Sequence, residues 1–135
     1  MSWLFGLISP KISKANKKKC EAVHGGPQNC FFQENKFYFA VGGNQKACFV
    51  GQDAHHNESF WIGLGCILNH KNNSGQLYIN DQWEKISDDA ERLNNIDGHF
   101  VFLQYKQNQF KIRTDRLGLR SLYWAQTDNE IVIST

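Results

Sequence analysis

The chain lacks the features that mark metal-stabilised, disulfide-stabilised and membrane-spanning proteins. Its four cysteines are separated by nine, seventeen and seventeen residues, so no two of them have the short spacing of a zinc-binding pair. No apolar run reaches the roughly 20 residues of a transmembrane helix, and no signal peptide opens the sequence. We therefore expect buried free thiols, no metal site and a cytoplasmic location.

Charged residues are also scarce. They make up 21% of the chain, whereas aromatic residues make up 13%, including ten Phe and four Trp. This composition is the opposite of that of a disordered chain, which has few aromatics and a high charge. A length of 135 residues suits one hydrophobic core, so we expect a single domain over residues 1–135.

The one concentrated charge is a lysine-rich stretch over residues 11–19, KISKANKKK. Clustered lysine is typical of surfaces that bind nucleic acid or anionic membranes. Here no stacking aromatic residues interleave it, and a lysine-rich stretch is commonly the solvated face of a helix. We expect neither nucleic acid nor a membrane as a partner.

Short apolar runs between Gly, Asn and Asp predict an antiparallel, strand-rich chain. We expect strands at residues 3–8, 37–41, 47–50, 59–68, 76–79, 98–105, 109–113, 121–125 and 130–134. The segments 3–8 and 99–103 are apolar at successive positions, which predicts burial on both faces. Helices are expected in residues 11–23 and 81–95, the second with Trp83, Ile86, Ala90 and Leu93 on its apolar face. The fold class is α+β, a layered sandwich of two antiparallel sheets flanked by helices.

The last forty residues carry a recognisable pattern. It reads IDGHFVFL at 96–103, IRTDRLGLRSLYW at 112–124 and EIVIS at 130–134. This pattern closely resembles the C-terminal segment of the glutaminase domain in the asparagine synthetase family, whose members are class II glutamine amidotransferases. MSWLFG at residues 1–6, HGGP at 24–27 and LGCILN at 64–69 are similar to three further motifs of that family. The residues that match the C-terminal motif are Gly98, Asp115, Arg116, Gly118, Arg120, Leu122 and Tyr123.

The resemblance implies the N-terminal-nucleophile (Ntn) hydrolase fold and assigns the catalytic positions. The family's nucleophile is a cysteine exposed by removal of Met1, and Ser2 stands there. Its oxyanion hole is formed by an Asn side chain and a Gly N–H, and these positions are Leu64 and Gly65. Leucine has no hydrogen-bond donor, and the loss of one such donor costs roughly 10²–10³ in rate.

Two further parts of the family's site also differ. The arginine that grips the glutamine carboxylate has no counterpart in residues 39–45, although such recognition needs a guanidinium. In the family, a further motif binds the glutamine amino group, and in this chain only Ser87-Asp88-Asp89 could take its place. An Asp pair there is also explained by stabilisation of a helix N-terminus. The resemblance therefore predicts a domain without glutaminase activity.

The expected function is that of a non-catalytic domain packed, in cis or in trans, against an ATP-dependent amide-forming synthetase domain outside this chain. β-Lactam synthetases and lasso-peptide cyclases are relatives of that kind. No cofactor is expected in this domain, since ATP and Mg²⁺ would belong to the synthetase domain, and a homodimer stays open. The alternative is an active amidohydrolase that uses Ser2 on an amide other than glutamine. A stand-alone binding module is a third interpretation.

Several other residues have both a chemical and a structural interpretation. His55 and His56 are candidate metal ligands, but adjacent side chains project to opposite sides of a strand and no third ligand is evident, so a polar loop is the favoured interpretation. Trp61, Tyr123 and Trp124 are expected to anchor the core.

Overall fold

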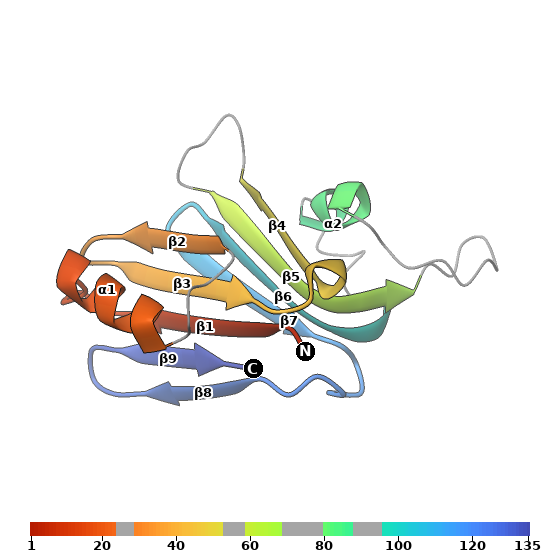
Figure 1. Ribbon diagram of the computed structural model, residues 1–135. Helices are drawn as coiled ribbons and strands as arrows, with labels where there is room; N and C mark the ends of the chain where they lie inside the picture. Colours follow the sequence, from red (N-terminus) through yellow and green to blue (C-terminus); the bar gives the residue numbers. More distant parts are fainter. Residues whose placement is uncertain (24–28, 53–58, 69–79, 88–95) are drawn as a thin grey trace. The chain divides into compact units, whose positions relative to one another are not determined.

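The computed structural model describes residues 1–23, 29–52, 59–68, 80–87 and 96–135 (Figure 1). The chain forms two compact units. Residues 1–44 and 122–135 make up the first unit, and residues 45–121 make up the second. Each unit contains one antiparallel sheet. The predicted fold class, α+β with two antiparallel sheets and little helix, is confirmed.

The first unit is a five-stranded sheet in the order β2-β3-β1-β9-β8. Its strands are β1 (Trp3–Ile8), β2 (Asn29–Gln33), β3 (Phe37–Gly42), β8 (Tyr123–Gln126) and β9 (Ile131–Ser134). The first strand along the chain therefore lies between β3 and β9, and the register pairs Gly6 with both Phe39 and Ile133. The interior strand β3, between β2 and β1, is buried along its whole length.

The helix α1 (Lys14–Val23) lies across one face of this sheet (Figure 1). It begins after a reciprocal cap, in which the Ser13 N–H donates to Asn16 Oδ1 at 3.2 Å and the Asn16 N–H donates to Ser13 Oγ at 3.4 Å. Ile12 and Cys20 pack against the apolar side chains that β1, β2 and β3 present on this face. The helix expected in the lysine-rich segment is thus present, and Lys14 is exposed to solvent.

The second unit is a four-stranded sheet in the order β4-β5-β6-β7. Its strands are β4 (Cys48–Gln52), β5 (Phe60–Leu68), β6 (Asp97–Lys106) and β7 (Gln109–Thr114), with a 3₁₀ turn η1 (Gln45–Ala47) before β4. The helix α2 (Asn80–Ser87) packs on one face through Trp83 and Ile86. Trp83 is fully buried and stacks on Phe49 and Phe102, with ring centroids 5.4 and 6.1 Å apart.

The two hairpins predicted near the end of the chain are confirmed as β6–β7 and β8–β9. The first turns at Gln107 and Asn108, which have φ values of 52° and 59°. Such left-handed residues suit a two-residue hairpin loop. The Tyr105 hydroxyl donates to Asn108 Oδ1 at 2.8 Å and fixes the turn.

The sequence predictions were wrong or incomplete in several places. The strand β2 was not predicted. β1 is not buried on both faces, because Trp3, Phe5 and Leu7 on the α1 side are half-exposed. The four cysteines are free, as predicted, but only partly buried. The strand predicted at 76–79, the histidines 55 and 56, and the latter half of the helix predicted at 81–95 lie outside the described residues.

The buried indole of Trp83 yields a stability prediction. Trp83→Ala removes the side chain around which the second sheet and α2 pack, so we expect the free energy of unfolding to fall by about 3–5 kcal/mol in urea denaturation followed by circular dichroism. Trp124→Ala is the matched control, because Trp124 is 67% exposed, and its effect should stay within about 0.5 kcal/mol. Equal losses in the two variants would contradict this packing.

Candidate functional site

The residues singled out by the amidotransferase resemblance fall into both units. Ser2, Leu122 and Tyr123 belong to the first unit. The second unit brings several of the others into two groups. Leu64, Gly65 and Gly98 lie on the paired strands β5 and β6, while Asp115, Gly118 and Arg120 share the turn that follows β7, together with Arg116.

Ser2, the candidate nucleophile, immediately precedes β1 and is buried, whereas Met1 is fully exposed. Gly43, just past β3, lies against this position with a φ of +103°. A Cβ on Gly43 would collide with the Met1 carbonyl oxygen and come within 2.7 Å of the Ser2 Cα. Glycine at 43 therefore permits the backbone of Met1 and Ser2 to pass close by, a contact that the sequence motifs did not reveal.

Leu64 stands at the candidate oxyanion position and lies in the middle of the second sheet. Its register partners are Cys48 on β4 and Val101 on β6. The side chain has an exposed fraction of 0%. A buried leucine presents only carbon atoms, so it offers no donor to a developing oxyanion.

Gly65 follows Leu64 with a φ of +98°, and a Cβ there would meet the carbonyl oxygen of His99. The close approach of β5 to β6 therefore explains why residue 65 is a glycine, and this explanation needs no catalytic role.

Asp115 accepts several hydrogen bonds in the turn that follows β7. It is buried, and its carboxylate accepts hydrogen bonds from the backbone N–H groups of Leu119 (2.9 Å), Arg120 (3.1 Å) and Phe100 (3.4 Å). Its own N–H donates to the Phe100 carbonyl at 3.1 Å, and the Gly118 N–H donates to its carbonyl at 3.1 Å. The tight connection predicted at Asp115 is therefore present.

The same contacts control the ionisation of Asp115. Burial alone would raise the pKa of the carboxyl, but hydrogen bonds from the backbone N–H groups of Leu119, Arg120, Phe100 and Leu117 together lower its pKa below the ordinary 3.8. The carboxylate thus remains charged at neutral pH and fastens the turn to β6.

A guanidinium and two thiols lie together on the sheet face that also carries Leu64. Cys66 is opposite His99 in the β5–β6 register, and Cys48 is opposite Leu64. Burial lowers the pKa of Arg120, while its proximity to Cys48 and Cys66 raises it. Burial raises the pKa of the Cys48 thiol to about 11, although the Arg120 charge lowers it. Cys48 is therefore a protonated, poorly nucleophilic thiol at neutral pH.

The remaining motif residues are surface features. Arg116 is exposed and Leu122 is half-buried. Tyr123 and Trp124 are each 67% exposed, so the prediction that they anchor the core is wrong. The reason is topological, since β8 is the last strand of its sheet and pairs only with β9. Trp61, on β5, is buried in the second core as predicted.

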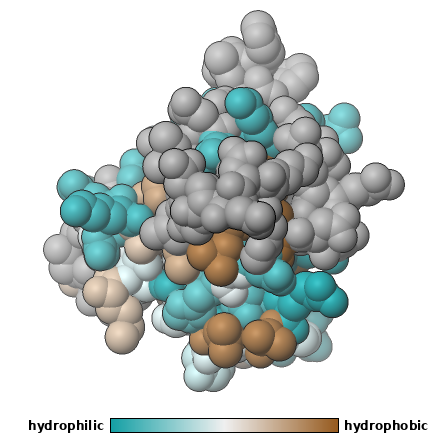
Figure 2. All heavy atoms as spheres, turned by 90° about the vertical axis from the view of Figure 1, so that its right-hand side faces the viewer, coloured by the Kyte–Doolittle hydropathy of each residue, from teal (hydrophilic) through white to brown (hydrophobic). Residues whose placement is uncertain are grey.

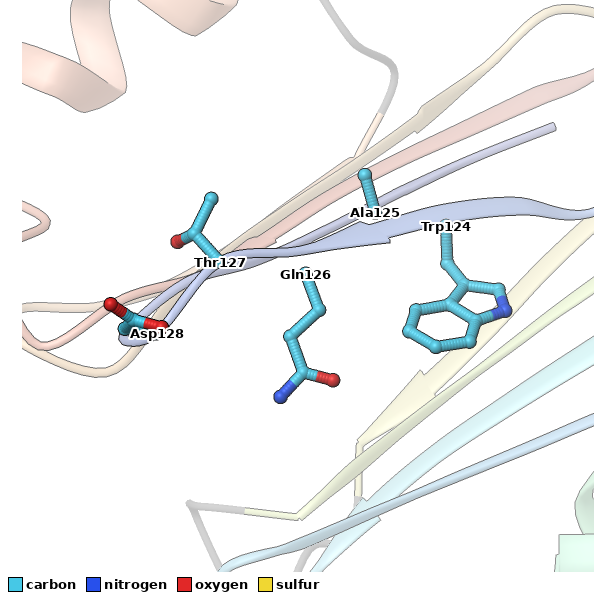
Figure 3. A pocket seen from close by; sticks show the side chains of 5 residues that line it. All are labelled: Trp124, Ala125, Gln126, Thr127 and Asp128. Carbon is cyan, nitrogen blue, oxygen red and sulfur yellow. The ribbon is translucent and has the colours of Figure 1, made fainter.

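A hollow of about 660 Å³ lies along β8 and the turn that follows it. Figure 3 shows Trp124 and Gln126 pointing to one side of the strand, and Ala125 and Thr127 to the other. Asp128 completes the lining. The described residues that line the hollow offer one carboxylate, one amide and one hydroxyl, and none of them is a cationic side chain that would bind an anionic substrate.

Within the described residues, no three His, Cys, Asp or Glu side chains are grouped to hold a metal ion. In the same part of the chain, no helix has the length and apolar character needed to cross a membrane. Comparisons of the chain with protein-family models, curated proteins and solved structures return no match.

The Asp115 contacts give a pH-dependent prediction. A lowered pKa means that the carboxylate stabilises the fold above its ordinary pKa of 3.8, and that this contribution is lost as the pH falls through the folded-state pKa. Asp115→Asn should lower the free energy of unfolding at pH 7 by about 1–3 kcal/mol, measured by denaturant titration.

The difference between Asp115→Asn and the unsubstituted protein should shrink in acid. The control is Asp128→Asn, which changes an exposed carboxylate and should shift stability by less than about 0.5 kcal/mol at either pH. A constant difference from pH 7 into strong acid would contradict the role of the charged form.

Proposed function

We propose that the chain is a glutamine-amidotransferase-like domain that has lost glutaminase activity and serves as a packing partner for an ATP-dependent, amide-forming synthetase domain. The observation that carries the proposal is the fully buried Leu64 at the oxyanion position. A carbonyl oxygen that gains negative charge there would meet a hydrocarbon surface in place of a donor, which raises the barrier to amide hydrolysis.

The surroundings of Ser2 support the same conclusion. An N-terminal nucleophile needs a free α-amino group as its base. With Met1 in place, the Ser2 nitrogen belongs to a peptide bond, and the Ser2 side chain is buried. The protonated thiol of Cys48 does not offer a substitute nucleophile, because its pKa is about 11.

The motif that carries the resemblance has a structural task in this chain. Asp115, Gly118 and Arg120 hold one turn through backbone hydrogen bonds, and these bonds require no substrate. A chain can therefore keep this pattern after the chemistry has gone, which supports a scaffold in preference to a hydrolase.

The proposal also covers the cellular compartment and the partner domain. Four free cysteines suit a reducing compartment, so we place the protein in the cytoplasm. The synthetase domain would supply the ATP and Mg²⁺ sites, in cis or in trans.

The test combines intact-mass spectrometry with assays of ammonia release from glutamine, asparagine and acetamide. We expect no release above the rate in buffer, whether or not Met1 has been removed. Ser2→Ala is the matched control and should leave that background unchanged. If a chain that begins at Ser2 releases ammonia and Ser2→Ala abolishes the release, the domain is a working serine-type amidohydrolase and the proposal is wrong.

A further inference from the structure

The strand β8 forms one edge of the first sheet (Figure 1). It pairs with β9 on one side, and no described strand pairs with its other side. All four of its residues are exposed. The backbone N–H and C=O groups on the outer side of an edge strand are a template on which a further strand can pair.

The hydrogen bonds of the β8–β9 hairpin determine which residues face this outer edge. The Thr127 N–H donates to the Glu130 carbonyl at 2.9 Å, so these two residues form a hydrogen-bonded pair. Hydrogen-bonded and non-hydrogen-bonded pairs alternate along an antiparallel ladder, and the register continues unbroken into β8. Ala125 therefore bonds to β9, whereas Trp124 and Gln126 turn their N–H and C=O groups to the outer edge.

The space and the charge along this edge suit an added strand. The hollow of about 660 Å³ is lined by residues 124–128, whose side chains point to both sides of β8 (Figure 3). Residues 121–127 contain no charged residue and no proline. Such residues commonly protect sheet edges from pairing, and β7, an edge of the second sheet, carries Lys111 and Arg113. Two copies of β8 can meet without like-charge repulsion.

Exposed apolar side chains elsewhere say less about a partner. Figure 2 shows one face of the molecule, on which hydrophobic atoms reach the surface beside hydrophilic ones. Individual apolar side chains at the surface are ordinary in proteins. An outer backbone edge is more specific, because an extended strand is the structure that completes its ladder of hydrogen bonds.

We propose that the outer edge of β8 pairs antiparallel with the same strand of a second copy of this chain. A two-fold axis at Ala125 places Trp124 opposite Gln126 of the second copy, and Gln126 opposite Trp124 of that copy. The outward N–H and C=O groups of each strand then meet those of the other, and each such pair exchanges both of its hydrogen bonds. The same surface is used on both copies, as two-fold symmetry requires.

Ala125 itself would face Ala125 of the second copy as a non-hydrogen-bonded pair, in which the Cα atoms lie about 4.5 Å apart. A methyl group puts no charge on the axis. The contact is small, because β8 has four residues and a stable interface buries roughly 800 Å² on each partner. We therefore expect a weak dimer, with a dissociation constant on the order of 100 µM. The inference concerns the first unit alone and stands whether or not the chain hydrolyses glutamine.

Sedimentation equilibrium of the full chain, from about 10 µM to about 1 mM, tests for this dimer. Gln126→Pro removes an N–H from the outer edge and none from the β8–β9 ladder, so it should weaken dimerisation by about tenfold or more. Gln126→Ala is the matched control, because it keeps the backbone N–H, and it should change the dissociation constant by less than about threefold. Circular dichroism verifies that each variant is folded.

Charges at position 125 test the two-fold axis. Residue 125 faces its own copy, so Ala125→Glu and Ala125→Lys should each weaken self-association by about threefold or more at low salt, because like charges directly opposite repel. An equimolar mixture of these two variants should associate more strongly than either variant alone, since a glutamate then faces a lysine.

Three results would overturn the proposal. The first is a chain that stays monomeric up to about 1 mM, which would leave the edge to a strand of a different protein. The second is an equal effect of Gln126→Pro and Gln126→Ala. The third is a mixture of the two charged variants that associates no better than either alone. Either of the last two would mean that the copies meet through another surface.

Discussion

Pairing of β1 with β9 joins residues that are more than a hundred positions apart. Gly6 lies opposite Ile133, the Leu4 N–H donates to Thr135 Oγ1 at 3.0 Å, and the Thr135 N–H donates to the Leu4 carbonyl at 3.1 Å. The whole second unit, residues 45–121, lies between these partners in the sequence. The first sheet is complete only when both ends of the chain have met, and such non-local pairing is typical of slow folding. It also fixes β1 in the sheet, and with it the position of Ser2 beside Gly43.

A single buried carboxylate has a comparable influence in the second unit. When Asp115 is buried, its carboxylate oxygens lose hydrogen bonds to water. Backbone N–H groups of β6 and of its own turn take the place of these bonds. This arrangement stabilises the fold at neutral pH. It also sets two leucines in solvent, where they contribute nothing to the core of the second unit. This one interaction explains the structural role of Asp115 in the turn that follows β7, and that role does not call for glutamine chemistry.

Much of the fold could be predicted because its signals are local. The apolar run of β1, the turn residues of the β6–β7 hairpin and the spacing of Trp83 and Ile86 all act over a few residues. β2 was missed because Asn29–Gln33 is short and flanked by turn-forming residues, so that its strand character comes from pairing with β3. The burial of Trp124 was mispredicted because composition does not distinguish an edge strand from a central one. The sequence motifs predicted which positions belong to the candidate site, but not the contacts that these residues make. The contact of Gly43 with Ser2 and the grouping of Arg120 with two thiols depend on the tertiary fold and left no local pattern.

Our central proposal is that the positions of this chain that resemble an amidotransferase site do not bind glutamine. The most direct measurement is a titration of the ¹⁵N-labelled protein with glutamine, followed through the amide signals of Ser2, Gly43 and Gly65. We expect these signals to stay unchanged at millimolar glutamine, because the Leu64 side chain is apolar and fully buried and residues 39–45 contain no arginine to bind the substrate carboxylate. Saturable shifts at these positions would show that the chain binds glutamine and would contradict the proposal.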